Sequence, residues 1–415
     1  ERGEKIHHFD IPSAFLNGEL SVDVYMKQPH GYIDPKFPSY VCFLLKALYG
    51  LKQASLAWYI KLDNVLTALG LNKHFANPCF YYLFKDNGEW IMVIIYVDDN
   101  AIAGTPDLRQ MVIDALVKEF SAKDLGLASR YIGTSIEYLP DGLLLHQKKD
   151  IEEMLHKFKL FNVTPIRTPY DKDVTFRMIS ESDPYDQTLY RSAIGSLMWY
   201  ALSTRPDIVF AVTALAQFQC SPTKLAWELI TRIFRYLKGT LNYGIFIPYP
   251  KLEQPQRFTL HPFTDASWAI PIMDNRSASG CIFLLNGIPV HWICRKQRLV
   301  TLSSTESEII SSSLCAQELL WIMQLLDPII TLAKPISISI DNLSMKYIIE
   351  SVLTSHRTKH LDIRYLFIRQ LIQDYPVILE WIPLDQNIAD IFTKYIDVAA
   401  NFKSLVGRIL RDREH

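Results

Sequence analysis

The sequence predicts an α+β chain of several domains, and three observations support this. Its 415 residues correspond to two or three domains at about 150 residues each. Residues 1–165 mix short strands with helices, whereas residues 166–255 are mostly helical and end in a proline-rich linker at 248–256. Residues 256–395 start with three strand-like runs and continue with alternating helices and strands, a pattern typical of a mixed sheet covered by helices. Residues 396–415 are a charged tail, and we expect its end, Arg408–His415, to be frayed.

Composition excludes several classes of protein. With 49% hydrophobic and 21% charged residues, the chain is too apolar to be disordered. Its 43 basic and 44 acidic residues give a formal charge of −1, so a nucleic-acid partner has to be recognised through local sites and not through a global basic field. The sequence contains no run of 18 or more consecutive apolar residues, so it predicts no membrane span. The six cysteines have no metal-ligand spacing, which predicts buried thiols in a reducing compartment.

A first acidic group lies in the first part of the chain. The apolar run Trp90–Val97, the pair Asp98 and Asp99, and the second run Ala101–Gly104 predict a β-hairpin. Paired aspartates at a hairpin tip are common as turn residues, and this interpretation stays open. Asp10 also follows a short strand-like stretch. Three converging carboxylates would need a divalent cation such as Mg²⁺, which prefers oxygen ligands.

A second acidic group lies in the last part of the chain. Asp265 comes just after a predicted strand, and Asp341 ends another. Glu306 and Glu308 occupy the first turns of a helix predicted over residues 305–326, and Asp390 lies in a later predicted helix. Each acid alone is also explained as a turn residue, a helix cap or a solvated side chain. Together they suit phosphodiester hydrolysis with two metal ions.

Five short stretches together resemble a known family, and the order in which they occur makes this resemblance specific. They are Phe9–Gly18, Tyr25–Pro29, Leu48–Ala54, Tyr96–Asp99 and Lys123–Gly126. Together they resemble the reverse transcriptase of copia-type LTR retrotransposons.

This resemblance implies roles for individual residues. Asp10, Asp98 and Asp99 match the polymerase metal ligands. Phe15 matches an aromatic steric gate that crowds a ribose 2′-hydroxyl, although core packing explains it too. Gln53 matches the glutamine beside the incoming nucleotide.

The last part of the chain is similar to the RNase H domain of the same family. The matching stretches are Thr264–Trp268, Arg276–Gly280, Ser303–Glu308, Arg357–Ile363 and Asn387–Lys394.

The resemblance implies that Asp265, Asp341 and Asp390 are metal ligands. It favours Glu308 as the fourth, because the RNase H pattern places an apolar residue directly after this glutamate. Glu306 is then the cap of the helix.

Local basic clusters are candidates for nucleic-acid contact, because basic side chains position a phosphate backbone without reading its sequence. Solvated helix and strand faces are the alternative interpretation. The middle of the chain resembles the thumb and connection region, so the resemblance spans residues 6–394. The candidate residues are Arg235, Lys238, Arg295, Lys296, Arg298, Arg357 and Lys359.

The implied architecture is a reverse-transcriptase palm with truncated fingers (1–165), a mostly helical thumb and connection (166–255), an RNase H-like mixed βα domain (256–395) and the tail (396–415). The implied function is that of an RNA-directed DNA polymerase with ribonuclease H. Its cofactors would be two Mg²⁺ per active site, with Mn²⁺ as the alternative ion. Its partners would be an RNA template, a DNA primer, dNTPs, an RNA:DNA hybrid and the rest of the polyprotein, with no membrane. By family resemblance it would be intracellular, in cytoplasmic particles and the nucleus.

Two departures from the family pattern support an alternative. Pro12-Ser13 and Ser55-Leu56 stand where the family has other residues. The resemblance also places the fingers strands upstream of the first aspartate. The alternative is therefore a truncated, catalytically decayed remnant that at most binds nucleic acid, or a chain that retains only RNase H activity.

Overall fold

The computed structural model describes residues 5–249, 257–351, 362–396 and 398–414. The chain forms two compact units, Glu1–Ile132 and Gly133–His415, which are described separately. The boundary predicted at residue 165 falls inside the second unit.

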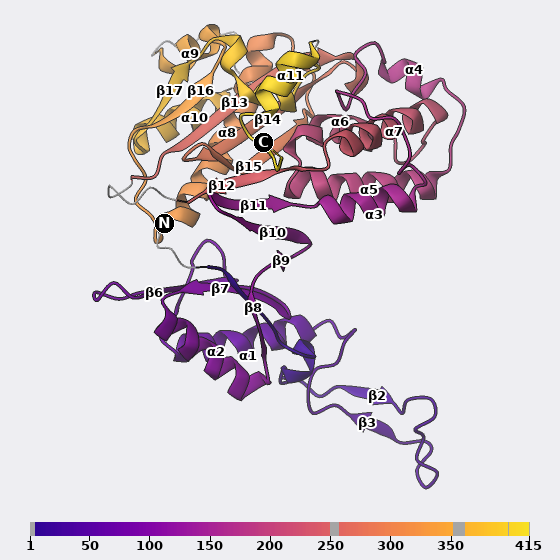
Figure 1. Cartoon of the computed structure of the whole chain (residues 1–415), viewed down its shortest axis with the longest axis vertical. Coiled ribbons are helices and arrows are strands. Elements are labelled where there is room, and N and C mark those ends of the chain that lie inside the picture. The colour runs from indigo at the N-terminus through magenta and orange to yellow at the C-terminus, as the bar shows by residue number, and fades with distance from the viewer. Residues whose placement is uncertain (1–4, 250–256, 352–361, 397, 415) are drawn as a thin grey trace. The chain divides into compact units, whose positions relative to one another are not determined.

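The first unit is built on a six-stranded antiparallel sheet in the order β4-β5-β6-β7-β1-β8 (Figure 1). The predicted hairpin is confirmed, because β6 and β7 pair antiparallel around a turn at Val97 and Asp98. The elements are β1 (His7–Asp10), η1 (Ala14–Asn17), β2 (Tyr25–Lys27), β3 (Val41–Phe43), α1 (Ala54–Ala68), β4 (Asn72–Lys73), β5 (Phe80–Phe84), β6 (Trp90–Tyr96), β7 (Asp99–Gly104), α2 (Pro106–Phe120), β8 (Lys123–Leu127) and β9 (Arg130–Tyr131).

Helices α1 and α2 pack against the sheet of the first unit. Helix α1 buries Trp58, Leu62 and Leu66 at the helical spacing that the sequence predicts. These side chains form one core with apolar residues of α2 and of β6, such as Leu116 and Val93. The hairpin that carries Asp98 and Asp99 therefore stands on a packed core.

The second unit contains a five-stranded mixed sheet in the order β15-β14-β13-β16-β17 (Figure 1). Strands β13, β14 and β15 are antiparallel neighbours, whereas β13, β16 and β17 run parallel. This is the predicted mixed sheet. Its elements are β13 (Leu260–Ile270), η3 (Pro271–Met273), β14 (Arg276–Leu285), β15 (Ile288–Lys296), α8 (Ser304–Leu326), β16 (Ile336–Ile340), α9 (Leu343–Glu350), α10 (Asp362–Asp374), β17 (Val377–Trp381), η4 (Leu384–Gln386) and η5 (Ile388–Phe392).

A second sheet and a group of helices complete this unit. The antiparallel strands β10, β11, β12 and β18 lie side by side. The remaining elements are β10 (Thr134–Leu139), β11 (Gly142–His146), α3 (Lys148–Lys157), α4 (Phe176–Ser180), α5 (Gln187–Ser203), η2 (Pro206–Ile208), α6 (Val209–Ala216), α7 (Lys224–Gly239), β12 (Tyr243–Pro248), α11 (Ala399–Val406) and β18 (Arg411–Asp412).

Both faces of the mixed sheet are buried, because a separate apolar core covers each. One core joins the sheet to α8, α9 and α10. The other joins it to the helical region and to η5 and α11. Trp292 of β15 joins the sheet to the helical region, because its indole Nε1 donates to the carbonyl of Ala201 in α5 at 2.8 Å.

Helix α8 is the one described helix that is long and apolar enough to cross a membrane, by length and composition only. Its buried residues, such as Ile309 and Leu319, belong to the core beneath the mixed sheet. Packing in that core accounts for its apolar character.

The structure differs from the sequence expectation at two places in this unit. The helix expected around Asp390 is a pair of 3-10 segments, η4 and η5, and the side chain of Asn387 caps the second by accepting from the backbone of Ala389 at 3.1 Å. The tail does not fray. Phe402 is buried in the core, and Arg411 and Arg413 form ion pairs with acids of the β10–β11 hairpin at 2.7 and 2.6 Å.

Candidate active sites

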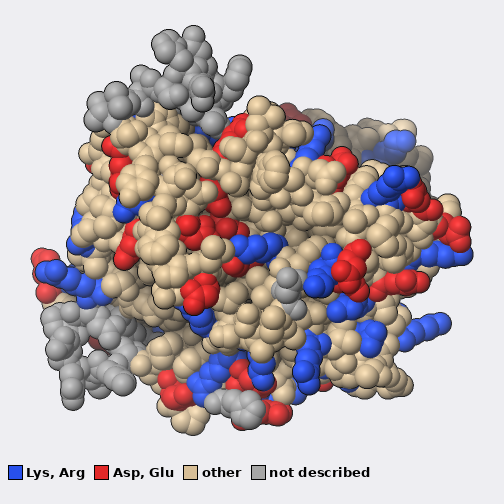
Figure 2. All heavy atoms as spheres, turned by 90° about the horizontal axis from the view of Figure 1, so that it is seen from above, with Lys and Arg blue, Asp and Glu red and all other residues tan. Residues whose placement is uncertain are grey.

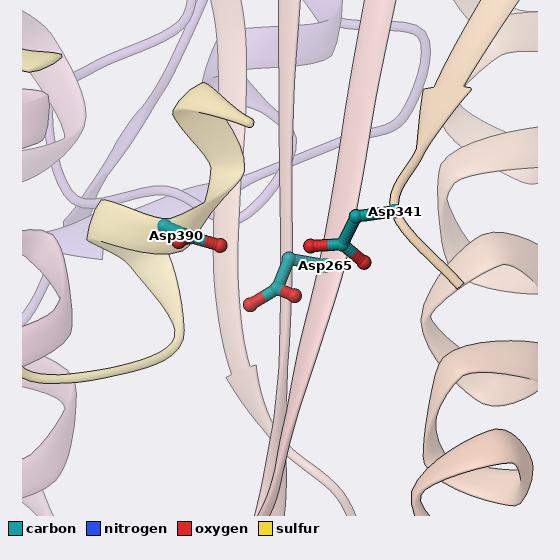
Figure 3. Close-up of side chains that lie close together, drawn as sticks. All are labelled: Asp265, Asp341 and Asp390. Atoms are coloured by element: carbon teal, nitrogen blue, oxygen red, sulfur yellow. The ribbon is translucent and has the colours of Figure 1, made fainter. Parts of the chain in front are cut away.

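Three aspartates converge in the second unit. One carboxylate oxygen from each of Asp265, Asp341 and Asp390 lies within 4.8 Å of the others. Figure 3 shows the carboxylates directed toward one another from three different elements. Asp341 directly follows β16, and Asp390 lies in η5. The expectation that Asp265 follows its strand is wrong, because β13 continues to Ile270 and Asp265 pairs with Gly280 in the middle of the sheet.

The two glutamates of α8 have different surroundings. The side chain of Glu306 accepts from the backbone N–H of Leu302 at 2.6 Å, while Ser303 Oγ accepts from the backbone of Glu306 at 3.2 Å. Glu306 thus caps the helix. Glu308 is buried, accepts a hydrogen bond from the backbone of Ala266 and interacts electrostatically with the cluster's aspartates.

Polar neighbours fix the positions of the aspartates. Asn387 Nδ2 donates to the carbonyl of Thr264 at 3.1 Å and to Asp341 Oδ2 at 3.3 Å. The hydroxyl of Thr393 donates to Asp265. Both Asn387 and Thr393 belong to the segment that carries Asp390, so one short segment orients all three carboxylates.

Gly280 lets that segment lie against the sheet. A Cβ at this position would come within 2.5 Å of Thr393 Cγ2 and 2.8 Å of Phe392 Cβ. Gly280 is also the cross-strand partner of Asp265. The missing side chain therefore allows Asp390 to approach Asp265.

Burial dominates the electrostatics of the cluster. Burial, together with the charge of Asp265, raises the pKa of Asp390 to about 7, although Lys394 Nζ lies 2.7 Å from its Oδ1. The same two causes raise the pKa of Asp341, and burial with the charges of Asp265 and Asp341 raises that of Glu308 well above its usual range. Burial alone would lower the pKa of Lys394, but the neighbouring aspartates raise it overall.

These residues fit a divalent cation. The buried carboxylates repel one another, and this repulsion contributes to their raised pKa values. A bound divalent cation would relieve the repulsion. The donor set consists of oxygens, which hard cations prefer. The cluster is therefore a candidate site for divalent ions.

The first acidic group is arranged differently. Asp10 ends β1 and Asp99 begins β7, and the register pairs the two directly, so their side chains share a face of the sheet. Asp98 lies in the turn, where the backbone of Val97 has a left-handed φ of 58°. A β-branched residue is strained in that region, and such strain is found mainly at functional sites. Trp58 Nε1 donates to the carbonyl of Val97 at 2.8 Å and holds the turn.

The carboxylate of Asp99 is already engaged. It contacts His8 Nε2 and accepts from the backbone N–H of Ile132 at 3.4 Å. His8 lies two residues before Asp10 on the same strand, hence on the same face. Among the described residues, which include Asp10, Asp98 and Asp99, these three do not form a group whose ligand atoms all lie within 4.8 Å of one another.

The roles of Phe15 as a steric gate and of Gln53 beside the incoming nucleotide stay predictions. Phe15 packs against Tyr49 at a ring-centroid distance of 4.9 Å and lines a cavity of about 420 Å³ that Trp58 and Val97 also line. Gln53 lies at the start of α1, where its carbonyl accepts from the backbone of Ala57 at 2.9 Å.

The predicted basic contacts differ in their surroundings. Three of them are held within the unit: Arg235 Nε donates to the carbonyl of Thr164 at 2.8 Å, Lys238 Nζ lies 3.6 Å from the ring centroid of Phe161, and Lys296 Nζ donates to Gln217 at 2.8 Å. By contrast, Arg295 and Arg298 line a cavity of about 370 Å³ together with Arg364. Arg357 and Lys359 lie outside the described residues.

The surface charge is mixed as well. On the face shown in Figure 2, Lys and Arg side chains alternate with Asp and Glu side chains, and no single sign covers it. This agrees with the near-neutral charge of the chain.

The sequence did not single out Lys394, Asn387, Thr393 or His8. The first three lie in the stretch Asn387–Lys394, where spacings of three and four residues from Asp390 place them around it. His8 could have been found from its alternation with Asp10 along the strand.

Comparisons with known proteins show what the chain is similar to. Residues 1–172 match the family model described as reverse transcriptase (RNA-dependent DNA polymerase). The chain is 36% identical, over 98% of its length, to the retrovirus-related Pol polyprotein from transposon RE1 of Arabidopsis thaliana, and it covers 28% of that protein. It is 30% identical, over 75% of its length, to a transposon Ty5-1 protein of Saccharomyces cerevisiae, which it covers completely. It also shows a weak likeness to the structure of LC11-RNase H1 in complex with an RNA/DNA hybrid (TM-score 0.26, 10% identity, 32% of this chain and 94% of the other).

The fold and the matches define a chain of mixed helices and sheets whose residues 1–172 match the reverse-transcriptase family. The chain belongs to the Pol polyproteins of copia-type retrotransposons. It spans less than a third of the RE1 polyprotein.

Proposed function

We propose that the second unit hydrolyses the RNA strand of an RNA:DNA hybrid with two divalent ions. The observation that carries this proposal is the convergence of Asp265, Asp341 and Asp390 in a largely buried site, with Glu308 beside them. Such a group of oxygen ligands suits Mg²⁺, with Mn²⁺ as a substitute.

The chain's own residues prepare this chemistry. Asp265, Asp341, Asp390 and Glu308 would hold the ions, which when bound supply charge neutralisation and Lewis acidity at the attacked phosphate. Asn387 holds Asp341 in place by its hydrogen bond. Because the ligands stand on packed strands and on a segment fixed by hydrogen bonds, the site is organised before substrate arrives.

We further propose that the cavity at β15 binds backbone phosphates of the hybrid. No ion pair or hydrogen bond of the Arg295, Arg298 or Arg364 guanidinium is found within the described part of the chain, so these groups are available to an anion. β15, which carries Arg295, is two strands away from β13, which carries Asp265. The cavity is also lined by Ile310, Ser313 and Gln317 of α8, the helix that carries Glu308.

For the first unit we propose RNA-templated DNA synthesis at Asp10, Asp98 and Asp99, with Phe15 and Gln53 beside the incoming dNTP. The family match over residues 1–172 and the strained turn at Val97 support it. The engagement of Asp99 by His8 favours a second candidate, a chain that retains only the nuclease activity.

Two substitutions test these proposals together. Asp341→Asn is expected to abolish cleavage of an RNA:DNA hybrid and to leave primer extension unchanged. Asp98→Asn is expected to abolish extension and to leave cleavage unchanged. Extension and cleavage are measured on one labelled hybrid in Mg²⁺ and in Mn²⁺. Cleavage without extension by the unsubstituted chain would select the nuclease-only candidate, and neither activity would contradict both proposals.

A further inference from the structure

One lysine lies inside the acidic cluster of the second unit. Lys394 Nζ is 2.7 Å from Asp390 Oδ1 and 3.7 Å from Asp265 Oδ2. Its ammonium group thus stands between two of the three aspartates proposed to bind divalent ions. A cation is therefore built into the site.

The ion pairs of the lysine lie on one side of the cluster, with Asp265 and Asp390. Asp265 is shared: on one side it faces Asp390 and Lys394, and on the other it interacts with Asp341 and Glu308. On the second side, the side chain of Asp341 accepts a hydrogen bond from the neutral amide of Asn387. Lys394 therefore forms ion pairs with the first half of the cluster and acts on the second half only through longer-range charge interactions.

The lysine is also better placed to move than the acids it contacts. Its side chain is 29% exposed, whereas those of Asp265 and Asp390 are 3% and 10% exposed. A lysine ammonium is a compact charge on a flexible stem of four carbons. It can swing toward solvent while the aspartates stay where the sheet and η5 hold them.

We infer that Lys394 is an internal counter-cation that makes the two divalent ions bind in sequence. The inference rests on the proposed function, because it concerns the same site. The first ion binds on the side of Asp265, Glu308 and Asp341. The second binds between Asp265 and Asp390 only after the ammonium has moved away, since a single positive charge about 4 Å from a divalent ion strongly opposes its binding.

The test is a calorimetric titration of the full chain with Mn²⁺, in the absence of nucleic acid. The Asp265→Asn chain provides the baseline for ions bound elsewhere, because Asp265 is common to both positions. Above that baseline, the unsubstituted chain is expected to bind one ion tightly and a second more weakly. Lys394→Met is expected to tighten the second ion about tenfold, and Lys394→Arg is expected to keep the weak second ion, because its positive charge remains.

A control variant and a second measurement make the result interpretable. Lys403→Met removes an exposed lysine of α11, in the same unit, and is expected to leave both affinities unchanged. The paramagnetic resonance spectrum of bound Mn²⁺ provides a second readout, because two ions sharing Asp265 would couple magnetically in Lys394→Met at lower Mn²⁺ than in the unsubstituted chain.

Equal affinities for the second ion in the unsubstituted chain and in Lys394→Met would overturn the inference, even if the hybrid is cleaved. No binding above the Asp265→Asn baseline in either chain would overturn the inference and the proposed nuclease site together.

Discussion

The two acidic groups of this chain differ in how their carboxylates are brought together. Asp98 and Asp99 are adjacent in sequence and Asp99 pairs with Asp10 across one sheet, yet these three carboxylates are not gathered at metal-binding distance. Asp265 and Asp390 are separated by 124 intervening residues, yet they lie within 4.8 Å of each other and of a third aspartate. Proximity in sequence therefore says little about proximity of the ligand atoms.

Burial explains the difference. The second group lies in a sheet with apolar cores on both faces, and Asp265, Glu308 and Asp390 are buried there. The first group lies at a hairpin end, where the side chain of Asp99 is 34% exposed and turns to His8. In the metal-free chain, the second site is thus organised and the first is not.

The largest effect is expected from Gly280→Ala, which attacks the organisation of the second site. The new Cβ would lie 2.5 Å from Thr393 Cγ2 and would push η5, with Asp390, away from β13. We expect a loss of about 1–3 kcal/mol in the free energy of unfolding, as for other overpacked cores. Divalent-ion binding at this site should weaken at the same time. Chemical denaturation and Mn²⁺ titration measure the two effects.

Gly195→Ala is the matched control. Gly195 lies in α5 of the same unit, and a Cβ there meets nothing within 4 Å. This change should stabilise the chain by up to about 1 kcal/mol, because alanine favours a helix over glycine. A Gly280→Ala chain as stable as Gly195→Ala, with unaltered ion binding, would contradict the role given to Gly280.

A smaller effect is expected from pH, and it should belong to the second site. The pKa of Asp390 is about 7 in the folded chain and about 3.9 when unfolded. Between these values the folded state binds more protons than the unfolded state, so the free energy of unfolding falls as pH rises from about 4 to about 7. In EDTA, thermal melts should therefore show that the unsubstituted chain loses Tm between pH 6 and pH 8 relative to an Asp390→Asn chain, which shares the opposite contribution of His146, His261 and His291.

Asp390→Asn should flatten this part of the pH profile, because the amide does not titrate. Added Mg²⁺ should raise the Tm of the unsubstituted chain mainly at the higher pH, where the carboxylates are charged. Identical changes in Tm between pH 6 and pH 8 for the unsubstituted chain and for Asp390→Asn, in EDTA, would show that the acids are not held in the repulsive arrangement described above.

The smallest effect is expected from His8→Gln, which tests whether the first site can be released. Without the imidazole, Asp99 is free to turn toward Asp10, and Mn²⁺ binding by an Asp265→Asn chain should tighten about two- to fivefold, in keeping with the modest strength of partly exposed pairs. Weaker binding after the change would mean that His8 supports the first site and does not compete with it.

Much of this arrangement could be predicted from the sequence, and the limits have physical causes. The helix expected over residues 305–326 is α8, Ser304–Leu326, and the strand expected at Ile336–Ile340 is β16, because capping and apolar runs are local signals. The position of Asp265 inside its strand and the folding of the tail against β12 depend on long-range packing, which no local pattern encodes. For the same reason the sequence indicated which acids share a motif but not that Lys394 lies among them.

The central claim is that, without nucleic acid, divalent ions bind at the second acidic group in preference to the first. Fe²⁺ in place of Mg²⁺, with ascorbate and peroxide, cuts the backbone next to the bound ion, and mass spectrometry locates the cuts. We predict cuts near Asp265, Asp341 and Asp390 that disappear in Asp265→Asn. Cuts confined to the segments around Asp10 and Asp98, unchanged by Asp265→Asn, would contradict the claim.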